Sequence, residues 1–191
     1  YMVDNMIRNS HKLESGFYLN QLDVLKEHIN QLEEKSQKTL LLGVSFALLD
    51  LVERYSFSLH HTCVMETGGM KGRRKELTRE ELHDRLRRGF GVNKIYSEYG
   101  MTELLSQAYS KSKGIFECPP WMRVCAREHQ DPFNRLPWGQ TGGLNIIDLA
   151  NRDSCAFIAT EDLGKVYSDS QFEVMGRLDD SEIRGCNLMV V

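Results

Sequence analysis

A helix with clear start and stop signals lies between two short apolar segments, and this arrangement constrains the fold most. Thr78 followed by Glu81 is a capping-box pattern that predicts the start of the helix, and Gly91 predicts its end. Residues 61–65 before the helix and 94–96 after it have the residue types of strands. A strand, a helix and a second strand in this order are typical of a parallel α/β sheet.

Apolar periodicity predicts further elements upstream. Residues 21–34 carry leucine and isoleucine at helical spacing, with charged residues on the other face. Residues 40–42 read as a strand that leads into a more apolar helix over 43–52. No apolar run reaches the length of a membrane-spanning helix, so we expect no membrane insertion.

The C-terminal part of the chain has a different pattern, with short strand-like segments in place of helices. Strand-like segments recur at 122–126, 143–147 and 155–159, separated by turn-rich stretches that contain the prolines. We therefore expect two parts. Residues 1–115 form an α/β nucleotide-binding part that is truncated at its N-terminal side, and residues 116–191 form a smaller β-rich subdomain.

Charge and cysteine content narrow the class of protein. The net charge of −3 gives no bulk attraction to nucleic acid. The five cysteines form no CxxC pair, which argues against a disulfide scaffold and against a structural zinc site. No signal peptide is recognisable at the start, and a reducing cytoplasm fits best.

Two polar loops follow the predicted parallel strands, at residues 66–72 and 97–103. The carboxyl ends of parallel strands are where such sheets bind ligands. In the first loop, Gly68 and Gly69 allow a flat ligand or a phosphate to approach the backbone closely. A pair of glycines in a loop is also compatible with an ordinary turn.

The second loop is richer in functional groups. Tyr99, Thr102 and Glu103 offer an aromatic face, a hydroxyl and a carboxylate, the set that a magnesium-bound nucleotide needs. The alternative is that Tyr99 and Met101 belong to the core while Glu103 caps a following helix. Farther on, residues 160–164 predict a turn with an acidic residue suited to ribose hydroxyls, and residues 176–180 predict a turn that carries an arginine.

Taken in order, these motifs resemble those of the acyl-adenylate-forming superfamily, which contains acyl-CoA synthetases, aryl-CoA ligases and luciferase-type enzymes. The matching segments are 97–103, 160–164, 176–180 and 183–185. A closer resemblance is to acyl-protein synthetases of the bacterial luminescence fatty acid reductase type. The segments that carry it are 66–74, 99–109, 118–123, 148–151 and 157–164. The resemblance covers about residues 40–191 and implies the C-terminal half of a larger protein.

The resemblance implies a nucleotide site. The residues implied to contact ATP through its adenosine part are Gly68, Gly69, Tyr99, Gly100, Asp162 and Arg177. Among them, Tyr99 would stack on the adenine and Asp162 would bind the ribose hydroxyls, with Arg177 assisting at the ribose or a phosphate. Thr102 would touch the α-phosphate, and Glu103 would help to hold Mg²⁺.

The implied reaction joins a long-chain fatty acid, or another carboxylic acid, to AMP with release of pyrophosphate. Acyl-protein synthetases then transfer the acyl group to a cysteine of their own, and Cys186 is the candidate by position. The neighbouring Arg184 would lower the pKa of that thiol. The alternative is that Cys186 is a small buried residue. An acyl reductase or another acyl-acceptor protein is the implied partner.

Two parts of the superfamily pattern are missing from these residues. The phosphate-binding loop rich in serine, threonine and glycine would precede residue 1, and the C-terminal lid with its catalytic lysine does not follow. We therefore expect the 191 residues alone not to catalyse adenylation. Two alternatives remain: a ligase that makes acyl- or aryl-CoA, and a non-catalytic scaffold subunit of a reductase or polysaccharide complex. A dinucleotide-binding fold is disfavoured, because no GxGxxG follows a strand.

Overall fold

The computed structural model describes residues 2–68, 77–129 and 131–178. The helices are α1 (Met2–Ser10), α2 (Leu22–Glu34), α3 (Ser45–Arg54), α4 (Arg79–Phe90) and the 3-10 turn η1 (Leu149–Asn151). The strands are β1 (Thr39–Gly43), β2 (Thr62–Glu66), β3 (Tyr96–Tyr99), β4 (Ala108–Ser110), β5 (Ile115–Glu117), β6 (Met122–Arg127), β7 (Thr141–Asp148), β8 (Phe157–Val166) and β9 (Gln171–Arg177).

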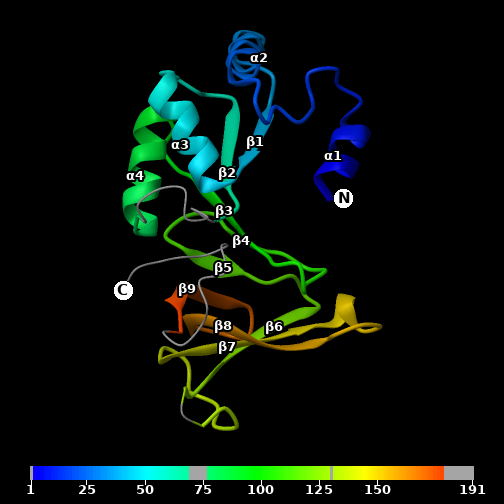
Figure 1. The fold of residues 1–191 in the computed structure, drawn as a ribbon, viewed down its shortest axis with the longest axis vertical. Helices are drawn as coiled ribbons and strands as arrows, with labels where there is room; N and C mark the ends of the chain where they lie inside the picture. The colour runs from blue at the N-terminus through cyan, green and yellow to red at the C-terminus, as the bar shows by residue number, and fades with distance from the viewer. Residues whose placement is uncertain (1, 69–76, 130, 179–191) are drawn as a thin grey trace.

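All nine strands belong to one mixed sheet in the order β1-β2-β3-β4-β5-β9-β8-β7-β6. The pairs β1–β2 and β2–β3 are parallel, and every later pair is antiparallel. Figure 1 shows the parallel strands together with α2, α3 and α4 in the upper part of the molecule and β6 to β9 in the lower part. The predicted parallel α/β unit is confirmed, and the β-rich remainder continues its sheet.

Helix α4 begins and ends where its local signals predict. The Thr78 side chain accepts a hydrogen bond from the Glu81 backbone, and the Glu81 side chain accepts one from Thr78 in return. Gly91 ends the helix in the left-handed conformation, with φ of 67°. The apolar stripe of α4 is buried against the sheet and α3, which fixes this helix behind β2 and β3.

Two clusters of buried side chains form the core. The first joins the helices to β1 and β2 and consists of Ile29, Leu41, Leu48, Leu49, Leu51, Leu59, Val64, Leu82, Leu86, Phe90 and Ile95. The second fills the β-rich part and consists of Tyr99, Leu104, Ala108, Phe116, Met122, Val124, Ala126, Leu144, Ile146, Val166, Phe172 and Val174. Strand β3 lies between the clusters, because Ile95 just before it belongs to the first and Tyr99 at its end belongs to the second.

Three segments predicted as loops or turns belong to strands. Residues 97–99 form most of β3, residues 160–164 lie in the middle of β8, and residues 176 and 177 end β9. Residues 179 and 180 of the second predicted turn lie outside the described residues. The predictions failed because inward-facing positions of these strands are polar. Ser97 and Asp162 are buried, so polar composition did not mark a turn here.

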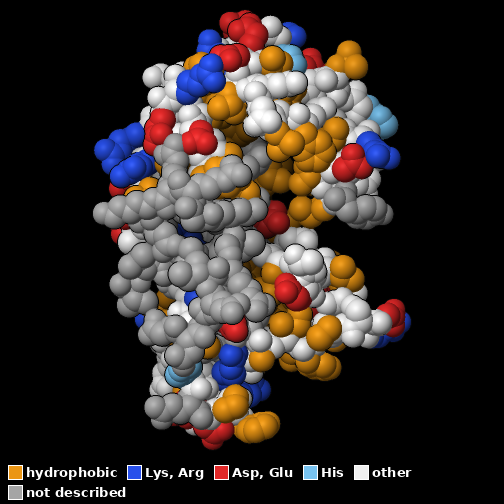
Figure 2. All heavy atoms as spheres, in the orientation of Figure 1, with side chains coloured by type: hydrophobic (Ala, Val, Ile, Leu, Met, Phe, Trp, Pro, Cys, Tyr) orange, Lys and Arg blue, Asp and Glu red, His pale blue; other side chains and the backbone are white. Residues whose placement is uncertain are grey.

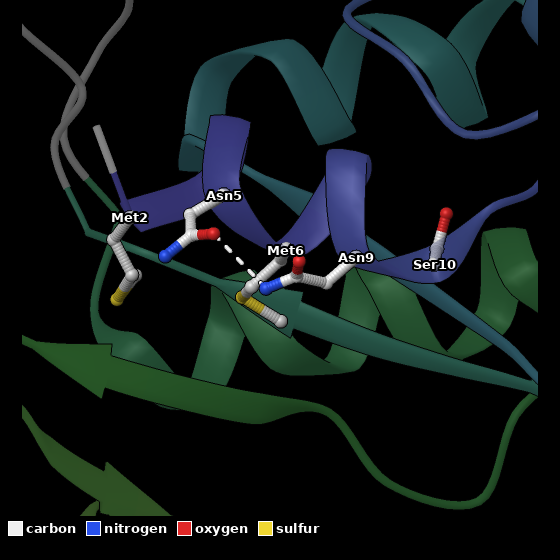
Figure 3. Close-up of a pocket in the computed structure, with 5 residues that line it drawn as sticks. All are labelled: Met2, Asn5, Met6, Asn9 and Ser10. Carbon is white, nitrogen blue, oxygen red and sulfur yellow. Dashed lines mark hydrogen bonds between the residues drawn. The ribbon is translucent and has the colours of Figure 1, made fainter.

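The N-terminal residues contribute little to either cluster. Helix α1 buries none of its residues. A hollow of about 530 Å³ is lined by Met2, Asn5, Met6, Asn9 and Ser10 of this helix (Figure 3). Figure 2 shows hydrophobic side chains over the upper and lower parts of the molecule, with the surface hollowed between them on one side. No helix among the described residues has both the length and the apolar composition needed to cross a bilayer.

The contact between α3 and α4 depends on Gly89, where an added Cβ would lie 2.3 Å from the Cβ of Val52. We predict that Gly89→Ala lowers the free energy of unfolding by about 1–3 kcal/mol, because the helices must move apart. This loss exceeds the gain in helix propensity of roughly 1 kcal/mol. Urea unfolding measures it, with Gly16→Ala as control, since a Cβ at Gly16 meets Tyr18 only at 3.9 Å. A Gly89→Ala variant as stable as the wild type would contradict this packing.

Candidate functional site

The loops after β2 and β3 leave the sheet at the same edge. The two strands are parallel, with Glu66 opposite Ser97 in register, so their carboxyl ends lie side by side. Gly68 in the first loop has φ of 74°, a conformation that favours glycine. Its N–H donates to Glu66 Oε2 over 2.6 Å. Gly69 lies outside the described residues. The predicted meeting of the two loops is therefore present at the level of the backbone.

A buried polar cluster lies at this edge, around the carboxylate of Glu66. Besides Gly68, this carboxylate accepts from Ser45 Oγ at 3.2 Å and lies 3.4 Å from His83 Nε2. The same His83 nitrogen is 3.2 Å from Ser97 Oγ. Burial raises the pKa of Glu66, but hydrogen bonds from His83 and Ser97 outweigh it, so the pKa lies below its ordinary value. This carboxylate is held as a satisfied anion.

Sequence reasoning missed Glu66 and His83 as a pair. A carboxylate at a strand end, two residues before a pair of glycines, was the available signal. His83 gave none, because its contact with Glu66 depends on how α4 packs behind β2. His83 contacts the oxygen atoms of both Glu66 and Ser97 through the same nitrogen, Nε2. In a Ser-His-acid triad the acid and the serine contact different ring nitrogens, so these three residues are not arranged as a triad. The cluster joins β2 and β3 to α3 and α4.

Tyr99 links this edge to the β-rich part. Its side chain is 2% exposed and its ring contacts the rings of Phe116 and Phe172, with centroids 5.8 and 5.2 Å away. The hydroxyl donates to Asp162 Oδ2 over 2.6 Å. Tyr99 is thus a core residue, which was one of the two alternatives derived from the sequence. Its stacking on a base stays a prediction.

Asp162 and Arg177 face each other across β8 and β9, where they are paired in register. Arg177 Nη2 donates to Glu161 Oε2 over 2.7 Å. Burial raises the pKa of Asp162 above its ordinary value, although the Tyr99 hydrogen bond and the Arg177 charge oppose this. The structure therefore brings Tyr99, Asp162 and Arg177 together, and it leaves Asp162 as a carboxyl that is costly to ionise.

The remaining predicted residues lie on the loop that leaves β3. Thr102 and Glu103 are exposed, and Met101 packs against the second core cluster. The chain passes Gly100 where an added Cβ would lie 3.4 Å from Gln107. Strand β4 follows, not a helix, so the alternative of Glu103 as a helix cap is wrong. Cys186 lies outside the described residues.

No protein-family model matches the chain, and no curated protein sequence matches it. Solved structures do match. One is 2-hydroxyisobutyryl-CoA ligase in the postadenylation state in complex with R3-HIB-AMP, with a TM-score of 0.62, 15% identity, and coverage of 84% of this chain and 37% of that one. Another is O-succinylbenzoate coenzyme A synthetase from Bacillus subtilis, in complex with ATP and magnesium ion. Its TM-score is 0.55, with 18% identity and coverage of 83% of this chain and 35% of that one.

A third match is a long-chain-fatty-acid–CoA ligase from Archaeoglobus fulgidus, with a TM-score of 0.55, 13% identity, and coverage of 81% of this chain and 37% of that one. The chain thus spans about a third of the length of these structures. At such identities the likeness concerns the fold alone. The fold class implied by the family resemblance is confirmed: the chain folds like one part of these ligases.

The two buried carboxyls are predicted to respond oppositely to neutralisation. Asp162→Asn should raise the free energy of unfolding at pH 7, because it removes a carboxyl whose pKa burial raises. That advantage should grow as the pH rises above about 3.8, the ordinary pKa of this group. Glu66→Gln should lower the stability at pH 7, and its deficit should shrink as the pH falls below about 4.5.

Urea unfolding of both variants and the wild type, repeated from pH 3 to pH 8, makes the comparison. The predicted result is opposite signs at neutral pH. Equal losses of stability in the two variants would show that Asp162 is as well satisfied as Glu66, and this would contradict the distinction drawn between them.

Proposed function

We propose that this chain is the nucleotide-binding part of an acyl-adenylate-forming ligase, which activates a long-chain fatty acid with ATP and transfers the acyl group to its own Cys186. The observation that carries the proposal is the meeting of Tyr99, Asp162 and Arg177 beside the edge where two parallel strands end. Ligand hydroxyl groups that donate to the Asp162 carboxylate would stabilise its charged form, which burial disfavours.

Each residue has a distinct part in this proposal. Asp162 accepts hydrogen bonds from the ribose hydroxyls, and Arg177 supplies positive charge beside it. Gly68 and Gly69 let the adenine lie against the backbone, with Tyr99 at the end of β3 and Gly100 directly after it. Thr102 contacts the α-phosphate. These contacts hold the α-phosphorus in place, so that positioning supplies most of the rate enhancement.

The proposed reaction has two steps, formation of an acyl-adenylate and transfer of the acyl group to the cysteine. A carboxylate oxygen of the fatty acid attacks the α-phosphorus, and the bond from that phosphorus to the leaving pyrophosphate breaks. The thiolate of Cys186 then attacks the acyl carbon, and the bond to AMP breaks, which leaves a thioester. In this scheme an acyl reductase or another acyl-acceptor protein takes the acyl group from the cysteine.

In this proposal Mg²⁺ is bound jointly by the protein and by the phosphates of the nucleotide. Among the residues that the structure describes, no group of three or more histidine, cysteine or acidic side chains could hold a metal alone. Mg²⁺ ordinarily keeps several waters and binds through one or two carboxylates together with phosphate oxygens. The exposed carboxylate of Glu103 meets that requirement. Bound Mg²⁺ would neutralise phosphate charge.

Two other functions compete with this one. The three solved structures of like fold described above are CoA ligases or synthetases, which supports a ligase whose acceptor is CoA instead of a cysteine. A non-catalytic scaffold subunit would share the fold but bind no nucleotide. Nucleotide binding therefore distinguishes the two ligases from the scaffold, and the identity of the acyl acceptor distinguishes the two ligases from each other.

Nucleotide binding by the 191-residue chain tests the proposed site. We predict that Asp162→Asn weakens AMP binding roughly 10- to 100-fold, the loss expected for hydrogen bonds to a charged group. Isothermal titration calorimetry measures this, with Asp169→Ala in the exposed turn between β8 and β9 as control. Unchanged AMP affinity in Asp162→Asn would remove Asp162 from the site, and a wild-type chain that binds no nucleotide would favour the scaffold.

The acceptor is tested on the intact natural protein, incubated with ATP, Mg²⁺ and a long-chain fatty acid. We predict a covalent acyl adduct by mass spectrometry that disappears in Cys186→Ser and is released by hydroxylamine, as a thioester is. Cys155→Ser is the control, at a cysteine whose side chain is exposed, and it should keep the adduct. Turnover that depends on CoA, without an adduct, would instead assign the protein to the CoA ligases.

A further inference from the structure

The loop between β3 and β4, residues 100–107, is held from the far end of β7. The carboxylate of Asp148 is fully buried, and its Oδ2 accepts the N–H groups of Leu105 at 3.0 Å and Ser106 at 2.9 Å. Its Oδ1 accepts Ser106 Oγ at 2.6 Å. Burial raises the pKa of Asp148, but these donors outweigh it, so the pKa lies below its ordinary value.

A second tie reaches Glu103 itself. The side chain of Asn151 is 4% exposed, and its Nδ2 donates to the Glu103 carbonyl oxygen over 2.6 Å and to the Cys155 carbonyl over 2.8 Å. The Ser154 hydroxyl donates to Asn151 Oδ1, which fixes the orientation of the amide. One buried amide therefore joins the backbone at Glu103 to the segment that connects β7 and β8.

The hydrogen bonds from Asp148 and from Asn151 both originate in one short segment, residues 148–151. Asp148 precedes the 3-10 turn η1, Asn151 ends it, and Asp148 Oδ1 also accepts the N–H of Ala150 at 3.1 Å. The spacing of three residues across this turn lets the carboxylate and the amide face the same loop. The two residues contact separate parts of that loop, its backbone at Glu103 and its backbone at Leu105 and Ser106.

The Glu103 side chain itself is exposed. Its carboxylate therefore depends on the backbone of the loop for its position. We infer that Asn151, supported by Asp148, is a positioning residue that holds Glu103 where a metal–nucleotide complex can reach its carboxylate. This inference rests on the proposed function, because it assigns the positioned carboxylate to Mg²⁺ and ATP. It adds to the site a residue that lies 48 positions after Glu103 in the chain.

The test uses Asn151→Asp, which keeps the shape of the side chain and the Ser154 hydrogen bond but cannot donate to Glu103. Two readouts on the 191-residue chain are compared with the wild type. Hydrogen exchange of residues 100–107 should become faster, because the loop loses its tie. The affinity for Mg²⁺-ATP should fall about tenfold while the affinity for AMP without metal stays within about twofold, because only the metal-binding carboxylate has moved.

Asn9→Asp is the matched control, since Asn9 donates to Asn5 on the exposed helix α1, far along the chain from this loop (Figure 3). It should change neither readout. Should Asn151→Asp not fold, Ser154→Ala removes only the hydrogen bond that orients the amide, and the same changes are expected to a smaller extent.

Unchanged exchange of residues 100–107 in a folded variant would overturn the inference, as would faster exchange with unchanged Mg²⁺-ATP affinity. An equal fall in AMP and Mg²⁺-ATP affinity would also overturn it, because it would indicate general damage to the site. A wild-type chain that binds neither nucleotide would refute the proposed function, and the exchange readout would still decide whether Asn151 holds the loop.

Discussion

The hydrogen bond from the Tyr99 hydroxyl to Asp162 is the contact on which the proposed site depends. Strands β3 and β8, which carry these residues, are separated in the sheet by β4, β5 and β9. A distance of 2.6 Å between the two side chains therefore requires the sheet to curl around the second core cluster. This curl is what brings residues of the β-rich part to the edge where the parallel strands end. Without it, Asp162 and Arg177 would be remote from the loops after β2 and β3.

Two buried carboxylates at this edge have opposite electrostatic environments. Glu66 is surrounded by donors, and its lowered pKa marks an anion that stabilises the fold. Asp162 has one tyrosine hydroxyl and a neighbouring arginine, which do not offset its burial. Groups whose pKa is perturbed by burial cluster at functional sites. The surrounding protein therefore compensates the charge of Glu66 better than that of Asp162, and Asp162 is the carboxyl that the proposed site uses.

Local signals in the sequence predicted helix α4 and the parallel unit, because Thr78, Glu81 and Gly91 act through neighbouring backbone. The same reasoning misassigned Ser97 and Asp162 to turns, since their partners lie on distant segments and leave no trace in the neighbouring sequence. The order of motifs led to the correct fold class and to residues that the structure brings together. It could not decide between a stacking and a core role for Tyr99, because the positions of Phe116 and Phe172 against its ring follow from the curl of the sheet.

In the proposed site, an adenosine monophosphate moiety binds between the ends of the parallel strands and the β8–β9 pair. A crystal structure of the chain with a non-hydrolysable acyl-adenylate analogue tests this most directly. We expect the ribose hydroxyls to lie within hydrogen-bonding distance of the Asp162 carboxylate and the adenine to lie against the loop at Gly68. An analogue bound elsewhere, with the Tyr99–Asp162 pair facing only protein, would contradict it.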